Sequence, residues 1–277
     1  MNPRRIYFFV NRTKPGAVEA HAALAGRLAA SGMEEAPSAA DADIVVALGG
    51  DGTILRAVRS FPGMPVAGFN IGSLGYLSAV ERKDFGTALE MLAQGRFSIS
   101  ARTMLDVSAN GAPAATALND IVLMRESSGR AATFALFVDS TQAARYAADG
   151  LVFATPTGST AYSLAAGGPV LMPDSRSFVI TPMNPHALGM RPMVVSDSVL
   201  LEAEHVGRGD GEEARIGVYA DGEAAFFLDP GARVSVSRST ETASLVQFDG
   251  HNPYETLSRK LGWTLSRRGT GAERNTP

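Results

Sequence analysis

The chain changes character near Gly95, and this change limits the folds that it can adopt. Before Gly95, short apolar runs alternate with segments that favour helices. Continuous apolar strands separated by helices indicate a parallel sheet that is covered on both faces. The expected strands are 6–11, 44–48 and 66–70, and the expected helices are 17–30, 53–59 and 85–94.

From residue 97 to residue 248, the apolar runs are mostly short, and turn signals separate them. Asn110-Gly111 is a strong hairpin signal. Several runs alternate apolar with polar residues, which is typical of a β-sandwich or a related all-β domain. One helix over 160–166 interrupts the series. The expected strands are 133–139, 151–155, 177–181, 199–204, 215–220, 233–237 and 245–248.

A last helix is expected over 254–261, and we expect it to return to the first domain. We therefore predict two domains: an α/β domain formed by residues 1–96 and about 250–266, and a β-rich domain formed by residues 97–249. The polar stretch 267–277 is expected to be a disordered tail. A cleft between two such domains is a common place for a ligand.

Composition excludes several classes of function. Lys and Arg together number 25 against 28 Asp and Glu, so the net charge is −3, which argues against a protein that holds nucleic acid on a basic surface. Cysteine is absent, which removes thiol nucleophiles, disulfides and Cys-ligated metals. The apolar run 6–10 is too short for a signal peptide, and no run reaches the length of a membrane span. We expect a cytoplasmic protein with no membrane partner.

Three glycines follow the apolar run 44–48, in the order Gly49-Gly50-Asp51-Gly52. A strand, a glycine turn and a helix start expose backbone N–H groups at the positive end of a helix, where a phosphate can bind. No lysine follows a glycine, so this is not a Walker A loop, and the spacing is not G-x-G-x-x-G. Thr53 is expected to begin the helix.

Asp51 is the informative residue of this turn, because a carboxylate repels a phosphate. The arrangement makes chemical sense if Asp51 meets a Mg²⁺ that the phosphate holds, or if it takes a proton from a nucleophilic hydroxyl. The alternative is a plain glycine turn in which Asp51 caps the helix. Arg56, one helical turn further on, either reaches a phosphate or is a solvated helix residue.

The most specific stretch is Asp149–Pro169. It contains a hydroxyl-rich turn, T-P-T-G-S-T, in which Ser159 or Thr160 is expected to cap the following helix. Tyr162 then lies in the first turn and could stack on a flat base. The alternative is an ordinary capped turn. The loop 70–78 (N-I-G-S-L-G-Y-L-S) is less specific, and a tight connection explains it equally well.

The remaining candidates are single residues. Arg130, in the loop after Asn119-Asp120, is a candidate cationic contact, and His186 is a candidate ligand contact, although a lone histidine is more often structural. No two histidines have metal-ligand spacing. A hydrolase elbow, G-x-S-x-G, is missing from the sequence, which disfavours nucleophilic hydrolysis.

Taken together, these motifs resemble those of the NAD kinase family, in its bacterial type that uses ATP or polyphosphate. The resemblance spans roughly residues 6–261. It rests on 49–53 (G-G-D-G-T), 70–77 (N-I-G-S-L-G-Y-L), Asn119-Asp120, 155–162 (T-P-T-G-S-T-A-Y), and Pro185-His186 with Arg191-Pro192. The first motif is shared with lipid kinases and phosphofructokinases, whereas 155–162 is highly specific.

The resemblance implies transfer of the terminal phosphoryl group of ATP to the 2′-hydroxyl of the adenosine ribose of NAD. It implies that Asp51 is the general base, that Gly52 lies at the substrate, and that Asn119 and Asp120 hold NAD. It also implies a divalent metal such as Mg²⁺ and a homodimer or homotetramer. The segment around the adenine would include Asp149, Thr160, Ala161, Tyr162, Ser163 and Ala165.

The chain departs from the family pattern at three positions. Ala165 stands where the family often has Ser, Ala147 where it often has a basic residue, and Glu223 where it often has Gln. Two other functions stay open at this point. A lipid kinase would share the glycine turn but would lack the segment 155–162, and a nucleotide sensor would bind NAD without turning it over.

Overall fold

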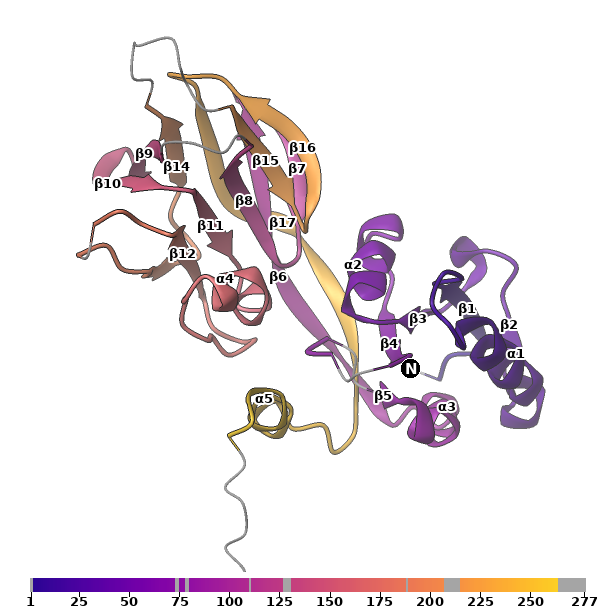
Figure 1. The fold of residues 1–277 in the computed structure, drawn as a ribbon. Coiled ribbons are helices and arrows are strands. Elements are labelled where there is room, and N and C mark those ends of the chain that lie inside the picture. Colours follow the sequence, from indigo (N-terminus) through magenta and orange to yellow (C-terminus); the bar gives the residue numbers. More distant parts are fainter. Residues whose placement is uncertain are drawn as a thin grey trace, which may run out of the picture.

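The computed structural model describes residues 2–72, 75–77, 80–109, 111–126, 131–187, 189–206 and 215–263. Its first part is an α/β layer structure in which β4, β3 and β1 are parallel neighbours (Figure 1). These strands are β1 (Arg5–Val10), β3 (Ile44–Gly49) and β4 (Val66–Asn70), with the short edge strands β2 (Glu34–Glu35) and β5 (Val80–Glu81).

Helices cover both faces of this parallel sheet. One face packs on α1 (Ala17–Leu28) and α3 (Phe85–Ala93), around Phe69 and Leu89, and the other packs on α2 (Asp51–Ser60), around Ile54. The apolar strand β3 is buried at every position, as expected for a strand covered on both sides. The predicted parallel sheet is confirmed. Short 3₁₀ helices lie at Ala29–Ser31, Ala39–Asp41, Arg82–Asp84 and Gly158–Thr160.

The second part consists of two antiparallel layers around one apolar core, which confirms the sandwich-like prediction. One layer has the order β13-β12-β11-β8-β15-β16, and the other contains β10, β9, β14, β17, β6 and β7. The bounds of the first layer are β8 (Asp120–Arg125), β11 (Gly150–Ala154), β12 (Ser177–Met183), β13 (Met193–Ser196), β15 (Ile216–Ala220) and β16 (Glu223–Leu228). Those of the second are β6 (Phe97–Ala109), β7 (Ala112–Ala117), β9 (Ala132–Val138), β10 (Thr141–Ala148), β14 (Leu201–His205) and β17 (Arg233–Phe248).

Two long strands, β6 and β17, join the two parts. They pair antiparallel from Phe97↔Phe248, beside the parallel sheet, to Ala109↔Val234, inside the sandwich. The expectation of separate strands over 233–237 and 245–248 is wrong, because β17 is continuous and only its register shifts, between Arg238 and Thr242. The turn signals in that stretch correspond to a bulge, not to a chain reversal.

The predicted hairpin at Asn110-Gly111 is confirmed by the pairing of Ala109 with Ala112, although Asn110 itself lies outside the described residues. The helix expected over 160–166 is shorter, since α4 spans only Tyr162–Ala165. The domain boundaries stay a prediction, and the tail 267–277 lies outside the described residues.

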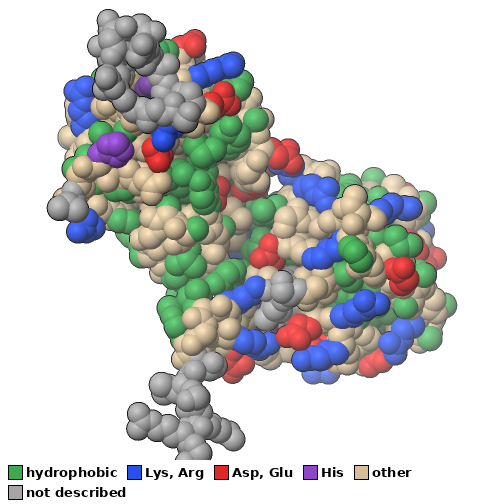
Figure 2. Space-filling view, in the orientation of Figure 1, with side chains coloured by type: hydrophobic (Ala, Val, Ile, Leu, Met, Phe, Trp, Pro, Cys, Tyr) green, Lys and Arg blue, Asp and Glu red, His purple; other side chains and the backbone are tan. Residues whose placement is uncertain are grey.

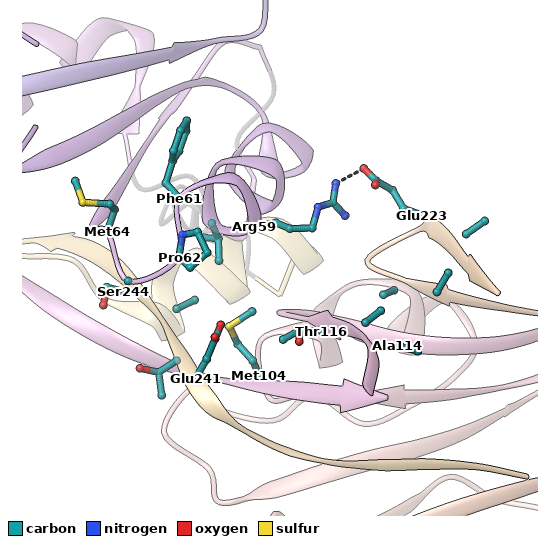
Figure 3. Close-up of a pocket in the computed structure, with 18 residues that line it drawn as sticks. Arg59, Phe61, Pro62, Met64, Met104, Ala114, Thr116, Glu223, Glu241 and Ser244 are labelled. Atoms are coloured by element: carbon teal, nitrogen blue, oxygen red, sulfur yellow. Dashed lines mark hydrogen bonds and ion pairs between the residues drawn. The ribbon is translucent and has the colours of Figure 1, made fainter. Parts of the chain in front are cut away.

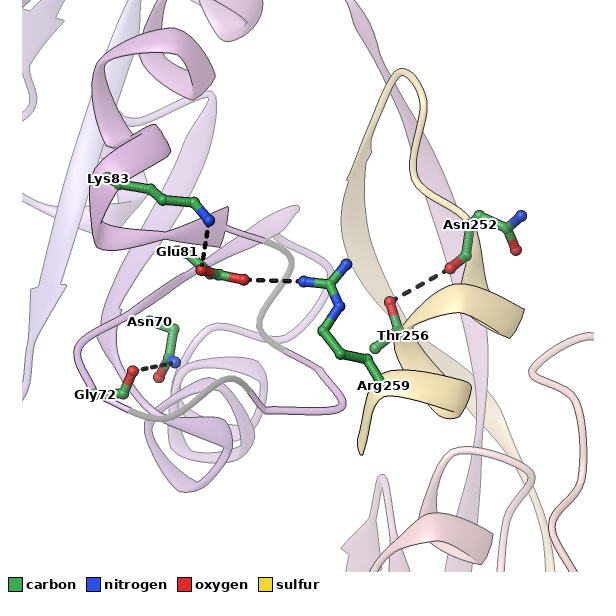
Figure 4. Close-up of polar contacts among 7 residues, drawn as sticks. All are labelled: Asn70, Gly72, Glu81, Lys83, Asn252, Thr256 and Arg259. Atoms are coloured by element: carbon green, nitrogen blue, oxygen red, sulfur yellow. Dashed lines mark hydrogen bonds and ion pairs between the residues drawn. The ribbon is translucent and has the colours of Figure 1, made fainter. Parts of the chain in front are cut away.

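The last helix, α5 (Pro253–Leu261), returns to the first part, as predicted. Asn252 caps it by accepting a hydrogen bond from the Tyr254 N–H, and Arg259 pairs with Glu81 of β5 at 3.0 Å (Figure 4). The surface is hollowed where the α/β part meets the sandwich (Figure 2). None of the helices in the described ranges is long and apolar enough to cross a membrane.

Candidate active site

The glycine turn lies at the carboxyl edge of the parallel sheet, between β3 and α2. A Cβ atom on Gly49 would lie 2.0 Å from Oγ1 of Thr53, so only glycine fits there. That hydroxyl accepts hydrogen bonds from the Gly50 N–H at 3.4 Å and from Nδ2 of Asn11 at 3.3 Å. The turn is thereby tied to its own helix and to the end of β1.

Helix α2 begins at Asp51, two residues before the predicted start at Thr53, and its N-cap is Gly50. The alternative in which Asp51 caps the helix is therefore wrong. The Asp51 carboxylate reaches instead to the segment 75–77, where Oδ2 accepts the Tyr76 N–H at 2.7 Å and Oδ1 accepts the Leu77 N–H at 3.2 Å. Two backbone donors thus set the direction of an acid side chain at the start of a helix.

The segment that holds Asp51 also meets the hydroxyl-rich turn of the sandwich. Tyr76 and Leu77 line a narrow pocket of about 60 Å³ together with Pro156, Thr157 and Thr160. Residues from α5 form another wall of this pocket. The segment 75–77 therefore links the two motifs, 49–53 and 155–162, that are about 100 positions apart in the sequence.

The hydroxyl-rich turn packs on the backbone of residues 118 and 119. The Thr155 hydroxyl donates to the Leu118 carbonyl at 2.6 Å, and the Thr155 N–H donates to the Asn119 carbonyl at 2.9 Å. A Cβ atom on Gly158 would lie 1.9 Å from that same Asn119 oxygen. The Gly in T-P-T-G is thus required by a close approach of two backbones.

The hydroxyls of Ser159 and Thr160 are also bonded inside the protein, and neither residue caps a helix as predicted. Ser159 is fully buried; its hydroxyl donates to the Pro156 carbonyl and accepts the Leu171 N–H. The Thr160 hydroxyl donates back to the Thr157 carbonyl at 3.1 Å. The hydroxyls of Ser159 and Thr160 thus bond to carbonyls of their own turn instead of accepting the free N–H groups at the start of the next helix.

Tyr162 is exposed, with 40% of its surface accessible, as a residue that stacks on a flat ligand would need to be. The neighbouring Ser163 is fully buried and shares a hydrogen bond with Thr181 at 2.9 Å. Ala161 is half-buried, and Ala165 is exposed. Only part of the predicted segment 160–165 therefore presents side chains to a ligand.

Asn119 and Asp120 are buried at the start of β8, beside a third residue that the motif search missed, Asp221. The Asp221 carboxylate accepts the N–H groups of Leu118, Asn119 and Asp120 at 2.9, 2.7 and 3.3 Å. Burial, and then the nearby Asp221, raise the pKa of Asp120 to about 7. Oδ1 of Asn119 is buried with no hydrogen-bond partner among the described residues, as is expected of a group that awaits a ligand.

Asp149 lies in a second polar group at the other end of β8. Its carboxylate accepts from Nδ2 of Asn184 at 3.0 Å and from Nε of Arg125 at 2.7 Å, and these two bonds lower its pKa. His186 lies close enough to add to the lowering of the Asp149 pKa, and the backbone N–H of His186 donates to the Ala147 carbonyl. Arg125 and Asn184 were not predicted, because nothing in their local sequence marks them.

The remaining predicted residues divide as follows. Gly52 is exposed in the first turn of α2, and Arg56 is exposed one turn later, with its guanidinium 6.0 Å from the ring of Phe9. Arg130 lies outside the described residues. Lys14, which sequence reasoning did not single out, has its ammonium beside the turn, 3.2 Å from where a Cβ atom of Gly50 would be.

A cavity of about 520 Å³ opens at the far end of α2, between that helix and strands β6, β7, β16 and β17 (Figure 3). In Figure 3, Arg59 of α2 points across to Glu223 of β16, with which it forms an ion pair. The cavity is lined from Val58 onward in α2, so about 10–12 Å of helix separates it from Asp51. The ion pair joins the two parts of the chain, and the cavity does not belong to the glycine turn.

The described ranges contain no cluster of three His, Asp or Glu side chains that could hold a metal ion by itself. Asp51 is the one carboxylate of the glycine turn. Mg²⁺ characteristically takes one or two carboxylates, several waters and the phosphates of a substrate. The donor set therefore fits a Mg²⁺ ion that arrives with a nucleotide.

Comparison with known proteins gives consistent matches over most of the chain. Residues 33–97 match the family model of the ATP-NAD kinase N-terminal domain, and residues 118–248 match that of the C-terminal domain. An NAD kinase of Symbiobacterium thermophilum is 41% identical over 256 residues, which cover 90% of this chain and 89% of the relative. An NAD kinase of Protochlamydia amoebophila is 36% identical over 79% of this chain and 77% of its own length.

Two solved structures are similar in fold. The yeast NADH kinase complexed with NADH superposes with a TM-score of 0.86 and 25% identity, covering 98% of this chain and 91% of that one. An NAD kinase from Archaeoglobus fulgidus in complex with ATP gives a TM-score of 0.75 and 27% identity, covering 95% and 99% of the two chains.

Proposed function

Because this chain belongs to the NAD kinase family, we propose that its two motifs hold the two partners of one phosphoryl transfer. The enzyme phosphorylates NAD, with ATP as the phosphoryl donor of the family. The site residues are our proposal: Asp51 and the glycine turn serve the reaction centre, and residues 119–120 and 149–165 serve NAD.

NAD would bind along the surface that starts at β8 and runs to α4. Asn119 offers a buried carbonyl oxygen that has no hydrogen-bond partner in the described part of the chain, and Asp120 offers a carboxyl group beside it. Tyr162 offers an exposed aromatic side chain on which the adenine could stack. Asp149, held by Arg125 and Asn184, would accept a hydrogen bond from a base N–H or a ribose hydroxyl.

In the reaction, the 2′-hydroxyl oxygen of the adenosine ribose forms a bond to the terminal phosphorus of ATP. The bond from that phosphorus to the bridging oxygen breaks, and ADP leaves. The hydroxyl proton passes to the Asp51 carboxylate, since a ribose hydroxyl is a weak acid and a base within reach helps the bond to form. When bound, Mg²⁺ neutralises phosphate charge, and Asp51 is the residue of the turn that would contact it.

The observation that carries this assignment is the anchoring of Asp51 by the N–H groups of Tyr76 and Leu77. A carboxylate has about four lone-pair sites, and these two bonds occupy two of them. They also hold the acid toward the segment that lines one pocket with Thr157 and Thr160. The base is therefore positioned before the substrates bind, which is what transfer with little covalent chemistry requires.

The direct experiment measures NADP formation by the purified protein with NAD, ATP and Mg²⁺, using an NADP-specific dehydrogenase as the coupled reporter. We expect NADP at least tenfold above background, and none from an NAD analogue that lacks the adenosine 2′-hydroxyl. Tight NAD binding without product would favour the sensor, and phosphorylation of a lipid alcohol alone would favour the lipid kinase. Parallel reactions with polyphosphate identify the second donor, if it is used.

We further propose that the active form is a cytoplasmic homodimer or homotetramer, on the basis of the family resemblance alone. Light scattering on the purified protein, coupled to gel filtration, measures the mass of the particle against the 29.0 kDa chain. A particle of one chain that retains full activity would contradict this proposal.

A further inference from the structure

Lys14 lies in the loop after β1, at the same sheet edge as the glycine turn. Its ammonium is 3.2 Å from the position that a Cβ atom of Gly50 would take, and 3.3 Å from that of Gly72. Gly72 has φ +123, a conformation that side-chain-bearing residues rarely adopt. The Lys14 ammonium thus lies close to the backbone at two glycines, Gly50 and Gly72.

The loop that carries Lys14 is tied to the turn. The Lys14 N–H donates to the Asn11 carbonyl at 3.0 Å, and Nδ2 of Asn11 donates to the Thr53 hydroxyl at 3.3 Å. The Asn11 N–H in turn donates to the Leu48 carbonyl of β3. These bonds hold the lysine near the first turn of α2 and do not depend on a bound ligand.

A second, independent feature at the same place is Asn70, at the end of β4. Its side chain is 1% exposed, and Oδ1 has no hydrogen-bond partner among the described residues, whereas Nδ2 donates to the Gly72 carbonyl (Figure 4). Oδ1 lies 4.0 Å from the position of a Gly50 Cβ atom, so it faces the same space as the ammonium. A buried acceptor without a partner indicates that a group is missing there.

Among the described residues, Lys14 also forms no ion pair. Each of the ion pairs found in the described ranges joins other residues, and the second lysine, Lys83, pairs with Glu81 at 3.1 Å. An ammonium next to helix N–H groups and glycine backbone attracts an anion. Lysine binds phosphate as a point charge, without the fork geometry of arginine.

We propose that Lys14 binds the terminal phosphates of the phosphoryl donor, with Asn70 accepting a hydrogen bond from the ammonium when the donor is in place. This inference rests on the proposed function, since it assigns the donor to the glycine turn. It implies recognition of the phosphate chain and not of the adenosine, because no base-binding group is involved. Inorganic tripolyphosphate should therefore compete with ATP.

The test compares Lys14→Met with Lys14→Arg and with the matched control Lys83→Met, which removes the same charge from a side chain that is 72% exposed. Calorimetric titrations without NAD measure the binding of ATP, ADP, AMP and tripolyphosphate in the presence of Mg²⁺. We expect Lys14→Met to weaken ATP, ADP and tripolyphosphate by about 10- to 100-fold, the range of a bond to a charged group, and AMP by less than about twofold. Lys14→Arg should restore part of the loss, and Lys83→Met should bind like the parent.

Wild-type affinity of Lys14→Met for ATP and tripolyphosphate would overturn the proposal. So would a loss of AMP and NAD binding that matches the loss for ATP, because that pattern reports a damaged fold. Failure of the proposed function looks different: the parent protein itself would make no NADP. In steady-state assays, Lys14→Met should lower kcat/KM for ATP by the same factor and leave KM for NAD within about twofold.

Discussion

Replacement of Asp221 should destabilise the corner of the molecule around Asn119 and Asp120. Its carboxylate accepts three buried backbone N–H groups, from Leu118, Asn119 and Asp120. A hydrogen bond to a charged group is worth about 1.5–3 kcal/mol, so Asp221→Ala should lower the free energy of unfolding by at least about 4 kcal/mol. Asp221 also has φ 48, and alanine in that region costs a further 1–2 kcal/mol or so.

Asp221→Asn should lose less, about 1–3 kcal/mol, because asparagine tolerates positive φ and keeps one oxygen acceptor. Oδ1 serves both Asn119 and Asp120, so mainly the bond from Leu118 is lost. Urea unfolding of the purified variants measures both losses.

Asp139 provides the matched control for Asp221. It has φ 47 in another hairpin turn, but it is exposed, and among the described residues its carboxylate accepts a single N–H, that of Leu200. Asp139→Ala should therefore cost no more than about 2 kcal/mol, since water can replace the lost acceptor. Equal losses in Asp139→Ala and Asp221→Ala would show that the turn geometry, and not the three buried bonds, explains the effect, and would refute the reasoning.

Two further predictions concern the same corner. Gly158→Ala should push the Asn119 carbonyl by more than 1 Å, raise KM for NAD and lower the unfolding free energy by about 1–3 kcal/mol or more. The control Gly26→Ala, which has open space around it in α1, should instead stabilise the protein by about 0.5–1 kcal/mol. Equal effects of the two substitutions would contradict the packing argument. Asp120 has a raised pKa, from 3.8 to about 7, so its protonation stabilises the fold below pH 4 and this contribution is lost as the pH rises through 7. Asp120→Asn should remove roughly 2–3 kcal/mol of the fall in stability between pH 5 and 8. Burial lowers the pKa of His251, which contributes in the opposite direction, but this contribution cancels when the variant is compared with the parent. Parallel curves of stability against pH for the two proteins would contradict the prediction.

Local sequence patterns were sufficient for the architecture. The apolar run in β3 and the helix signals around it predicted the parallel sheet, because a strand covered on both faces needs no polar positions. The alternation in 233–237 predicted a strand correctly, but the break before 245–248 was wrong. A bulge and a chain reversal both need residues that tolerate unusual backbone, so local sequence does not separate them.

The candidate site was predictable only where its chemistry is local. The turn around Asp51 and the segment 155–162 stand out as consecutive unusual residues. Asp221-Gly222 is a hairpin signal in its own right, yet the partners of the Asp221 carboxylate lie 101 to 103 positions earlier. Lys14 is one cation in a polar loop until the fold places it beside Gly50. Such contacts depend on tertiary structure, which no sequence window contains.

The role of the acid in the glycine turn is the central claim, and Asp51→Asn tests it most directly. The variant keeps the size of the side chain and an oxygen for the Tyr76 N–H, but it cannot take a proton from the ribose hydroxyl. Single-turnover NADP formation with saturating NAD, ATP and Mg²⁺ should fall by about 10²-fold or more, while the calorimetric Kd for NAD stays within about twofold and the exposed control Asp229→Asn keeps full activity. Turnover near that of the parent would contradict the assignment of Asp51 as the base.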